Sequence, residues 1–86
     1  MKTIYVVMEC YSGSDYTGEP SALGSFEELQ TAIEYFEEAI ADTQPSEPVR
    51  YEECKYIRED GCIIYELTNF DEDYHCYIKL EKTVLI

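Results

Sequence analysis

The stretch SFEELQTAIEYFEEAIAD, residues 25–42, decides the fold because it carries the chain's helical period. Its apolar residues recur at three- and four-residue steps, as on the buried stripe of an amphipathic helix. Ser25 and Glu28 fit a capping box, which predicts that the helix begins at Ser25. Pro45 and Pro48 are expected to end the helical region. The apolar stripe consists of Phe26, Leu29, Ile33, Phe36 and Ile40.

The segment before the helix has strand character. KTIYVVMEC, residues 2–10, alternates as a strand with one strongly buried face. A loop is expected over residues 11–21, and ALGSF, residues 22–26, adds a brief extended piece before the helix. The buried face carries Ile4, Val6, Met8 and Cys10, whereas Tyr5, Val7 and Tyr77 are expected on the exposed face of the sheet.

Three strand segments follow the helix, over residues 49–57, 62–68 and 75–86. Asp60-Gly61 lies between the first two and is typical of a tight hairpin. A two-residue turn would pair Glu59 with Cys62, and a three-residue bulged turn would pair Arg58 with Cys62. We favour the bulged turn because it places the apolar residues of both strands on one side. The last strand is expected to bury Cys76, Ile78 and Leu80.

These segments predict a single α+β domain over residues 1–86, with the order β-α-β-β-β. We expect one four-stranded, mostly antiparallel sheet with the single amphipathic helix packed on one face. A chain of 86 residues has room for one small core only. If it were unpaired, the final segment KTVLI would form an apolar sheet edge.

The net charge of −13 limits the partners of the protein. Such a charge repels nucleic acid and anionic membrane, and it favours a basic protein partner. The sequence has no apolar run long enough to span a membrane and no secretory signal, so we expect a cytoplasmic protein.

Little in the sequence indicates catalysis or cofactor binding. The four cysteines are expected to be reduced, with no C-x-x-C pair for zinc or redox chemistry. The segment DEDYH, residues 71–75, lacks the glycine and the final glutamate of a calcium-binding loop, so we read it as a solvated acidic turn. No nucleotide-binding or nucleophile motif is present. We expect no enzyme activity, no cofactor and no metal.

Acidic residues gather on one face of the predicted helix. At 100° per residue, Glu34 and Glu38 each lie within about 20° of Glu27. Tyr35 and Asp42 flank one side of this row, and Glu37 flanks the other. The repulsion within the row costs on the order of 1 kcal/mol. Between Lys2 and Arg50 there are ten acidic residues and no basic one.

This pattern predicts a surface that imitates nucleic acid. Carboxylates four helical residues apart are separated by about 6 Å along the axis, close to two phosphate steps of about 3.4 Å. Tyrosines interleaved with the acids add amphipathic contacts where bases would stack. The predicted contact residues are Asp15, Tyr16, Glu19, Glu27, Glu34, Tyr35, Glu37, Glu38, Asp42, Asp71, Glu72, Asp73 and Tyr74.

In size, charge and the segments FEELQTAIEYFEEAIAD and NFDEDY, the chain resembles phage-encoded inhibitors of bacterial defence nucleases. These include anti-CRISPR and anti-restriction proteins, several of which imitate DNA. The resemblance implies binding to the basic nucleic-acid-binding groove of a nuclease, without catalysis. The alternative is a non-enzymatic interaction module, such as a homodimer formed through the exposed sheet face.

Overall fold

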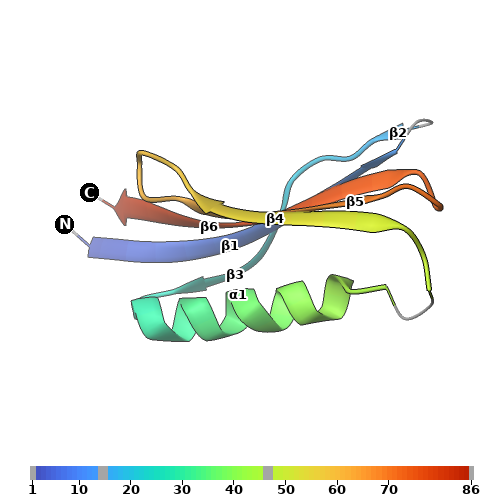
Figure 1. The fold of residues 1–86 in the computed structure, drawn as a ribbon. Helices are drawn as coiled ribbons and strands as arrows, with labels where there is room; N and C mark the ends of the chain where they lie inside the picture. Colours follow the sequence, from blue (N-terminus) through green and yellow to red (C-terminus); the bar gives the residue numbers. More distant parts are fainter. Residues whose placement is uncertain (1, 14–15, 46–47, 86) are drawn as a thin grey trace.

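The computed structural model describes residues 2–13, 16–45 and 48–85. It is an α+β fold in which one helix packs against one antiparallel sheet (Figure 1). The elements are β1 (Lys2–Gly13), β2 (Tyr16–Thr17), β3 (Ser21–Phe26), α1 (Leu29–Thr43), β4 (Tyr51–Ile57), β5 (Ile63–Asn69) and β6 (Tyr74–Leu85).

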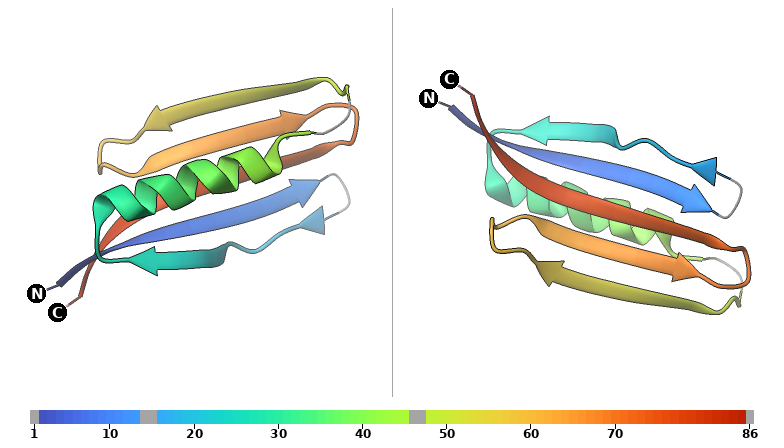
Figure 2. Two further views of the ribbon diagram at one scale, coloured as in Figure 1. Left: turned by 90° about the horizontal axis from the view of Figure 1, so that it is seen from below. Right: turned by 90° about the horizontal axis from the view of Figure 1, so that it is seen from above.

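The sheet has the order β2, β1, β6, β5, β4, and β3 also pairs with β1. β2 and β3 follow each other along the same side of β1, so the sheet is five strands wide, not four as predicted. The predicted order β-α-β-β-β also differs, because three strands, not one, precede the helix. The first and last strands, β1 and β6, lie side by side near its middle (Figure 2). Within the final apolar segment, residues 82–85 pair with β1, whereas β5 ends opposite Leu80, so among the described strands these residues have a neighbour on one side only.

The helix packs over β6, β1 and β3 and determines which face of the sheet is buried. β6 contributes its predicted residues to this core, because Cys76, Ile78 and Leu80 are all fully or almost fully buried. Val7 lies opposite Leu80, so it shares the helix-covered face and is fully buried. The core also contains Ala32, Phe36, Tyr65 and Leu67.

The prediction for β1 was therefore wrong. Its more apolar side, with Ile4 and Met8, faces away from the helix and is only half-buried. Tyr5 and Val7, expected on the exposed face, lie on the helix side. The register with β6 causes this reversal, since antiparallel neighbours opposite each other share a face. Tyr77 does lie on the open face.

The helix begins later than the capping box predicted. Ser25 belongs to β3, and α1 begins at Leu29 with Glu28 as its N-cap residue and no side-chain cap. Leu29 is 44% exposed, so the buried stripe starts instead at Ala32 and continues through Phe36. The short extended piece over ALGSF and the end of the helix before Pro45 are confirmed.

The hairpin between β4 and β5 has the bulged turn. The Arg58 N–H donates to the Cys62 carbonyl at 2.9 Å, and the Gly61 N–H donates to the Arg58 carbonyl at 2.9 Å. Gly61 adopts a φ of 86°, which glycine reaches without strain. Ile57 then lies directly opposite Ile63, as the apolar pattern predicted.

The four cysteines lie apart as free thiols, with Cys62 and Cys76 buried, Cys10 half-buried and Cys54 exposed. Among the described residues, no helix combines the length and the apolar character needed to cross a membrane.

Candidate functional site: an acidic groove beside the helix

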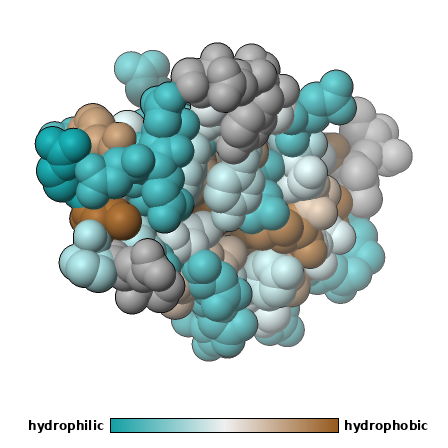
Figure 3. Space-filling model, turned by 90° about the vertical axis from the view of Figure 1, so that its right-hand side faces the viewer, coloured by the Kyte–Doolittle hydropathy of each residue, from teal (hydrophilic) through white to brown (hydrophobic). Residues whose placement is uncertain are grey.

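An acidic groove runs along the side of α1 that faces β1 and around the end of the helix. It consists of two adjoining hollows of about 280 and 410 Å³. Both are lined by Tyr11, Asp42 and Thr43, so they form one continuous depression. Figure 3 views the molecule from this end, where most of the surface is hydrophilic with small apolar patches. The acidic groove carries four carboxylates, from Glu9, Glu38, Asp42 and Glu72.

The helix supplies the carboxylates at the centre of the acidic groove. Glu38 and Asp42 lie one turn apart on the groove side, and Glu34 continues the row on the exposed surface of α1. Within the described residues, none of these three carboxylates makes an ion pair or a side-chain hydrogen bond. The last turn of α1 contains no basic residue, so the negative end of the helix dipole adds to this charge.

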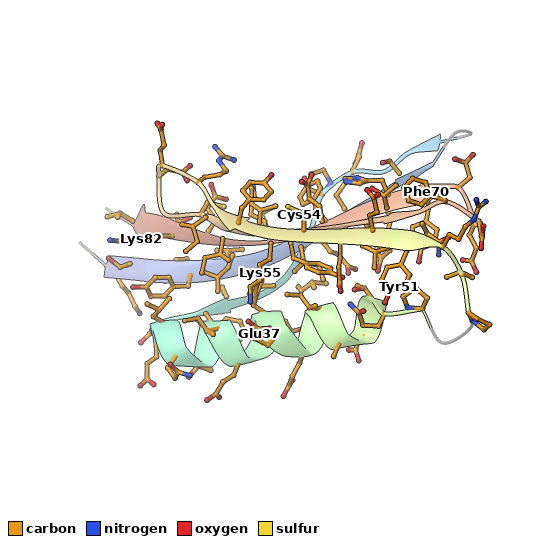
Figure 4. The ribbon with its side chains drawn as sticks, viewed as in Figure 1. Glu37, Tyr51, Cys54, Lys55, Phe70 and Lys82 are labelled. Atoms are coloured by element: carbon orange, nitrogen blue, oxygen red, sulfur yellow. The ribbon has the colours of Figure 1, made fainter. Side chains whose placement is uncertain are left out.

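Three other predicted contact residues already pair with cations of the same chain. Glu27 pairs with Lys2, and Glu37 pairs with Lys55, which reaches from β4 toward the helix (Figure 4). The Arg50 side chain binds Asp71 at 2.9 Å. The Arg50 backbone N–H also donates to Asp71, and these hydrogen bonds lower the pKa of the Asp71 carboxyl.

Tyrosines form the walls of the acidic groove. The rings of Tyr11 and Tyr74 contact each other with centroids 6.3 Å apart, which joins β1 to β6 at the groove. Tyr35 packs against Phe26 and donates its hydroxyl to the Leu23 carbonyl at 3.3 Å. The predicted tyrosines at 35 and 74 therefore shape the groove as well as lining it.

The tight turn between β5 and β6 positions Glu72. The buried Asn69 side chain accepts a hydrogen bond from the Glu72 backbone N–H at 2.9 Å. Asp73 then adopts a φ of 54°, a left-handed conformation that aspartate tolerates better than most residues. This geometry directs the chain back into β6, where Tyr74 lines the acidic groove and Asp73 lines a separate hollow beside Phe70.

The remaining predicted contacts lie elsewhere. Glu19 is exposed near the outer edge of the sheet, away from the groove lining. Asp15 lies outside the described residues, and only the backbone of Tyr16 is described. The structure adds Glu9 and Tyr11, which the sequence did not single out. Both lie on the helix side of β1. The sequence assigned the strand side with Glu9 to the exposed face and placed Tyr11 in a loop over residues 11–21, but β1 continues to Gly13 and β2 lies within that loop.

A buried polar group connects the helix end to β4. The Tyr65 hydroxyl donates to Glu53 at 2.7 Å and accepts from the Gln44 side chain at 2.8 Å. Burial, together with the Glu53 carboxylate, raises the pKa of Tyr65 to about 12. Burial also raises the pKa of the Cys76 thiol to about 11. The folded protein therefore holds both protons more tightly than the unfolded chain does.

Stability is expected to fall in alkaline solution. A raised pKa contributes stability that is fully present below the unfolded pKa, and ordinary values are 9.0 for cysteine and 10.0 for tyrosine. The melting temperature should therefore decline as the pH rises from 9 to 12. Tyr65→Phe should flatten the upper part of this decline, as followed by circular dichroism. An identical slope in the variant would contradict this assignment.

The acidic groove contains no grouping of His, Cys, Asp or Glu that is arranged as metal ligands, and none occurs elsewhere in residues 2–13, 16–45 and 48–85. Comparison with known proteins finds no matching family model, no matching curated protein and no matching solved structure. The site is therefore interpreted from its own geometry.

Proposed function

We propose that the protein is an acidic inhibitor that binds the basic nucleic-acid-binding groove of a bacterial defence nuclease. The observation that carries this proposal is the row of Glu34, Glu38 and Asp42, which no cation of the described chain neutralises. A row of like charges costs stability in the free protein. A surface of lysine and arginine side chains would remove that cost on binding.

The arrangement suits competition with a nucleic acid. Successive carboxylates of the row are separated by about 6 Å along the helix axis, which approximates every second phosphate of one strand. Glu9 and Glu72 extend the charge sideways into the acidic groove. Lysine and arginine side chains of the nuclease would enter this depression, with their aliphatic stems against Tyr11 and Tyr74.

The inhibitor acts by occupancy and needs no catalysis, cofactor or metal. Its charge steers it toward the basic groove and raises the association rate. Bound there, it excludes the nucleic acid that the same lysines and arginines would hold. In this proposal it works in the cytoplasm of a bacterial cell, where the nuclease meets foreign DNA.

The experiment is affinity capture from bacterial lysate at low salt, followed by a cleavage assay on any nuclease recovered. The native protein should retain a nuclease, inhibit its cleavage of DNA and be displaced by excess DNA. Glu34→Lys with Glu38→Lys should abolish capture.

The matched control is Glu59→Lys with Glu81→Lys, which makes the same change in net charge in the β4–β5 turn and on the open face of the sheet. This control should capture the nuclease as the native protein does. Recovery of no nuclease, or equal recovery with the Glu34→Lys/Glu38→Lys variant, would contradict the proposal.

A further inference from the structure

The outer edge of β4 carries backbone N–H and C=O groups that do not pair with another strand in the described part of the chain. Residues Tyr51–Ile57 pair with β5 on one side only, and β4 is the last strand in the sheet order. All seven residues are exposed, with Ile57 70% exposed. The helix lies over β6 and leaves β4 uncovered (Figure 2). An edge of this kind is a template for a further strand.

Two hydrogen bonds establish which backbone groups of β4 point outward. The Phe70 N–H donates to the Arg50 carbonyl at 2.8 Å, and the Arg58 N–H donates to the Cys62 carbonyl at 2.9 Å. Even-numbered residues of this segment therefore bond toward β5, because bonding direction alternates along an antiparallel strand. The outward N–H and C=O groups belong to the odd-numbered residues Tyr51, Glu53, Lys55 and Ile57.

The geometry points to a second copy of this chain as the occupant of the edge, paired antiparallel with β4 about a two-fold axis at Cys54. In this register Glu53 lies opposite the partner's Lys55, and Lys55 lies opposite the partner's Glu53. Tyr51 lies opposite the partner's Ile57 in the same way. Each outward residue thus meets a residue of opposite charge or of matching apolar character.

The neighbouring registers are unfavourable, so the pairing is specific. Only odd-numbered residues have outward hydrogen-bonding groups, so the strands can slip only in steps that keep odd residues opposite odd residues. One such slip moves the two-fold axis to Glu53, so that Glu53 lies opposite the partner's Glu53. The slip in the other direction sets Lys55 opposite the partner's Lys55. Like charges directly opposite each other are destabilising, which leaves the register centred on Cys54.

An apolar hollow beside β4 fits the same register. It measures about 380 Å³ and lies between α1 and β4, with Ile33, Phe36, Ile57 and Ile63 in its lining. In the dimer the partner's Tyr51 lies next to Ile57, on the side that faces the helix. Figure 4 shows Tyr51 and Lys55 on this side of β4 and Cys54 on the other. The tyrosine ring would cover the hollow and remove its apolar lining from water.

Charge sets the conditions for pairing. Each chain carries −13, so two copies repel at low ionic strength, and salt should strengthen the dimer by screening this repulsion. Arg50 and Arg58 lie opposite each other across the interface, but Asp71 and Asp60 of the same chain already pair with them. Glu9, Glu38, Asp42 and Glu72, the carboxylates of the acidic groove, lie outside β4, so the dimer does not depend on the proposed function.

The first test measures mass against concentration by analytical ultracentrifugation at high salt. The native protein should dimerise. Lys55→Glu sets glutamate opposite glutamate, and Glu53→Lys sets lysine opposite lysine, so each variant alone should self-associate at least tenfold more weakly. An equimolar mixture of the two variants should recover dimers, because the two glutamates of one variant then face the two lysines of the other.

The second test uses diamide to crosslink the two Cys54 side chains that meet at the two-fold axis. This reagent takes two electrons and two protons from the two Cys54 thiols, so an S–S bond forms between the copies and diamide becomes the hydrazine. A non-hydrogen-bonded pair places the Cα atoms about 4.5 Å apart, within the range of a disulfide. The native protein should give a covalent dimer, and Cys54→Ser should give none.

A native protein that stays monomeric at high salt would overturn the inference. Charge variants that dimerise as the native protein does, or a mixture that remains monomeric, would also overturn it. Circular dichroism of each variant checks that it is folded, because in the native chain Glu53 accepts a hydrogen bond from the Tyr65 hydroxyl and Lys55 pairs with Glu37.

Discussion

Phe36→Ala is expected to destabilise the fold by about 3–5 kcal/mol, the range for truncating a buried aromatic ring. Phe36 is only 1% exposed and heads the set of largest fully buried side chains. It packs with Val7, Leu67 and Ile78, so it joins α1 to the sheet. A small domain has about 5–15 kcal/mol of total stability, so this loss would unfold a sizeable fraction of the molecules. Urea denaturation followed by circular dichroism measures it.

Leu29→Ala is the matched control on the same helix. Leu29 belongs to the apolar stripe that the sequence predicts, yet it is 44% exposed. Its truncation should cost no more than about 0.5 kcal/mol, as for other exposed sites. Equal losses for the two variants would show that the helix packs through a different face.

Local sequence signals were sufficient for much of the fold. Alternation and turn chemistry located the β4–β5 hairpin, including the bulged turn at Asp60-Gly61, and the helical period located α1. The face of β1 was mispredicted because it depends on its pairing with β6, which is distant in the sequence. Local alternation favours the side with Ile4 and Met8, but the register places Val7 under the helix. The capping signal at Ser25 was also misleading, because Ser25 belongs to β3 and pairs with Val6 of β1.

The candidate site was predicted only in part for the same reason. The sequence predicted Glu38, Asp42 and Glu72 as contact residues. It also placed Tyr35 and Asp42 on one flank of the helix and Glu37 on the other. That division is present in the structure, where Glu37 faces Lys55 and Asp42 faces the acidic groove. No local signal brings Glu9 to this groove, since its place depends on where the helix ends over the sheet. The ion pairs that neutralise Glu27 and Glu37 are equally non-local.

Neutralising the unpaired carboxylates should weaken binding to the proposed target, a nuclease, far more than neutralising the paired ones. Glu38→Gln with Asp42→Asn removes two charges that no cation of the described chain compensates. Loss of one member of a desolvated charge pair costs about 2–5 kcal/mol, so the affinity should fall at least about 100-fold. Glu27→Gln with Glu37→Gln makes the same change in net charge but removes carboxylates already paired with Lys2 and Lys55.

The second pair of substitutions should reduce the affinity less than about tenfold, because those ion pairs would compete with the nuclease for the same carboxylates. Surface plasmon resonance over a series of salt concentrations measures both effects. Binding of the native protein should weaken steeply with salt through a slower association rate, whereas self-association through β4 should strengthen. Equal losses for the two double variants would mean that the nuclease responds to total charge, and the acidic groove would then have no special part in recognition.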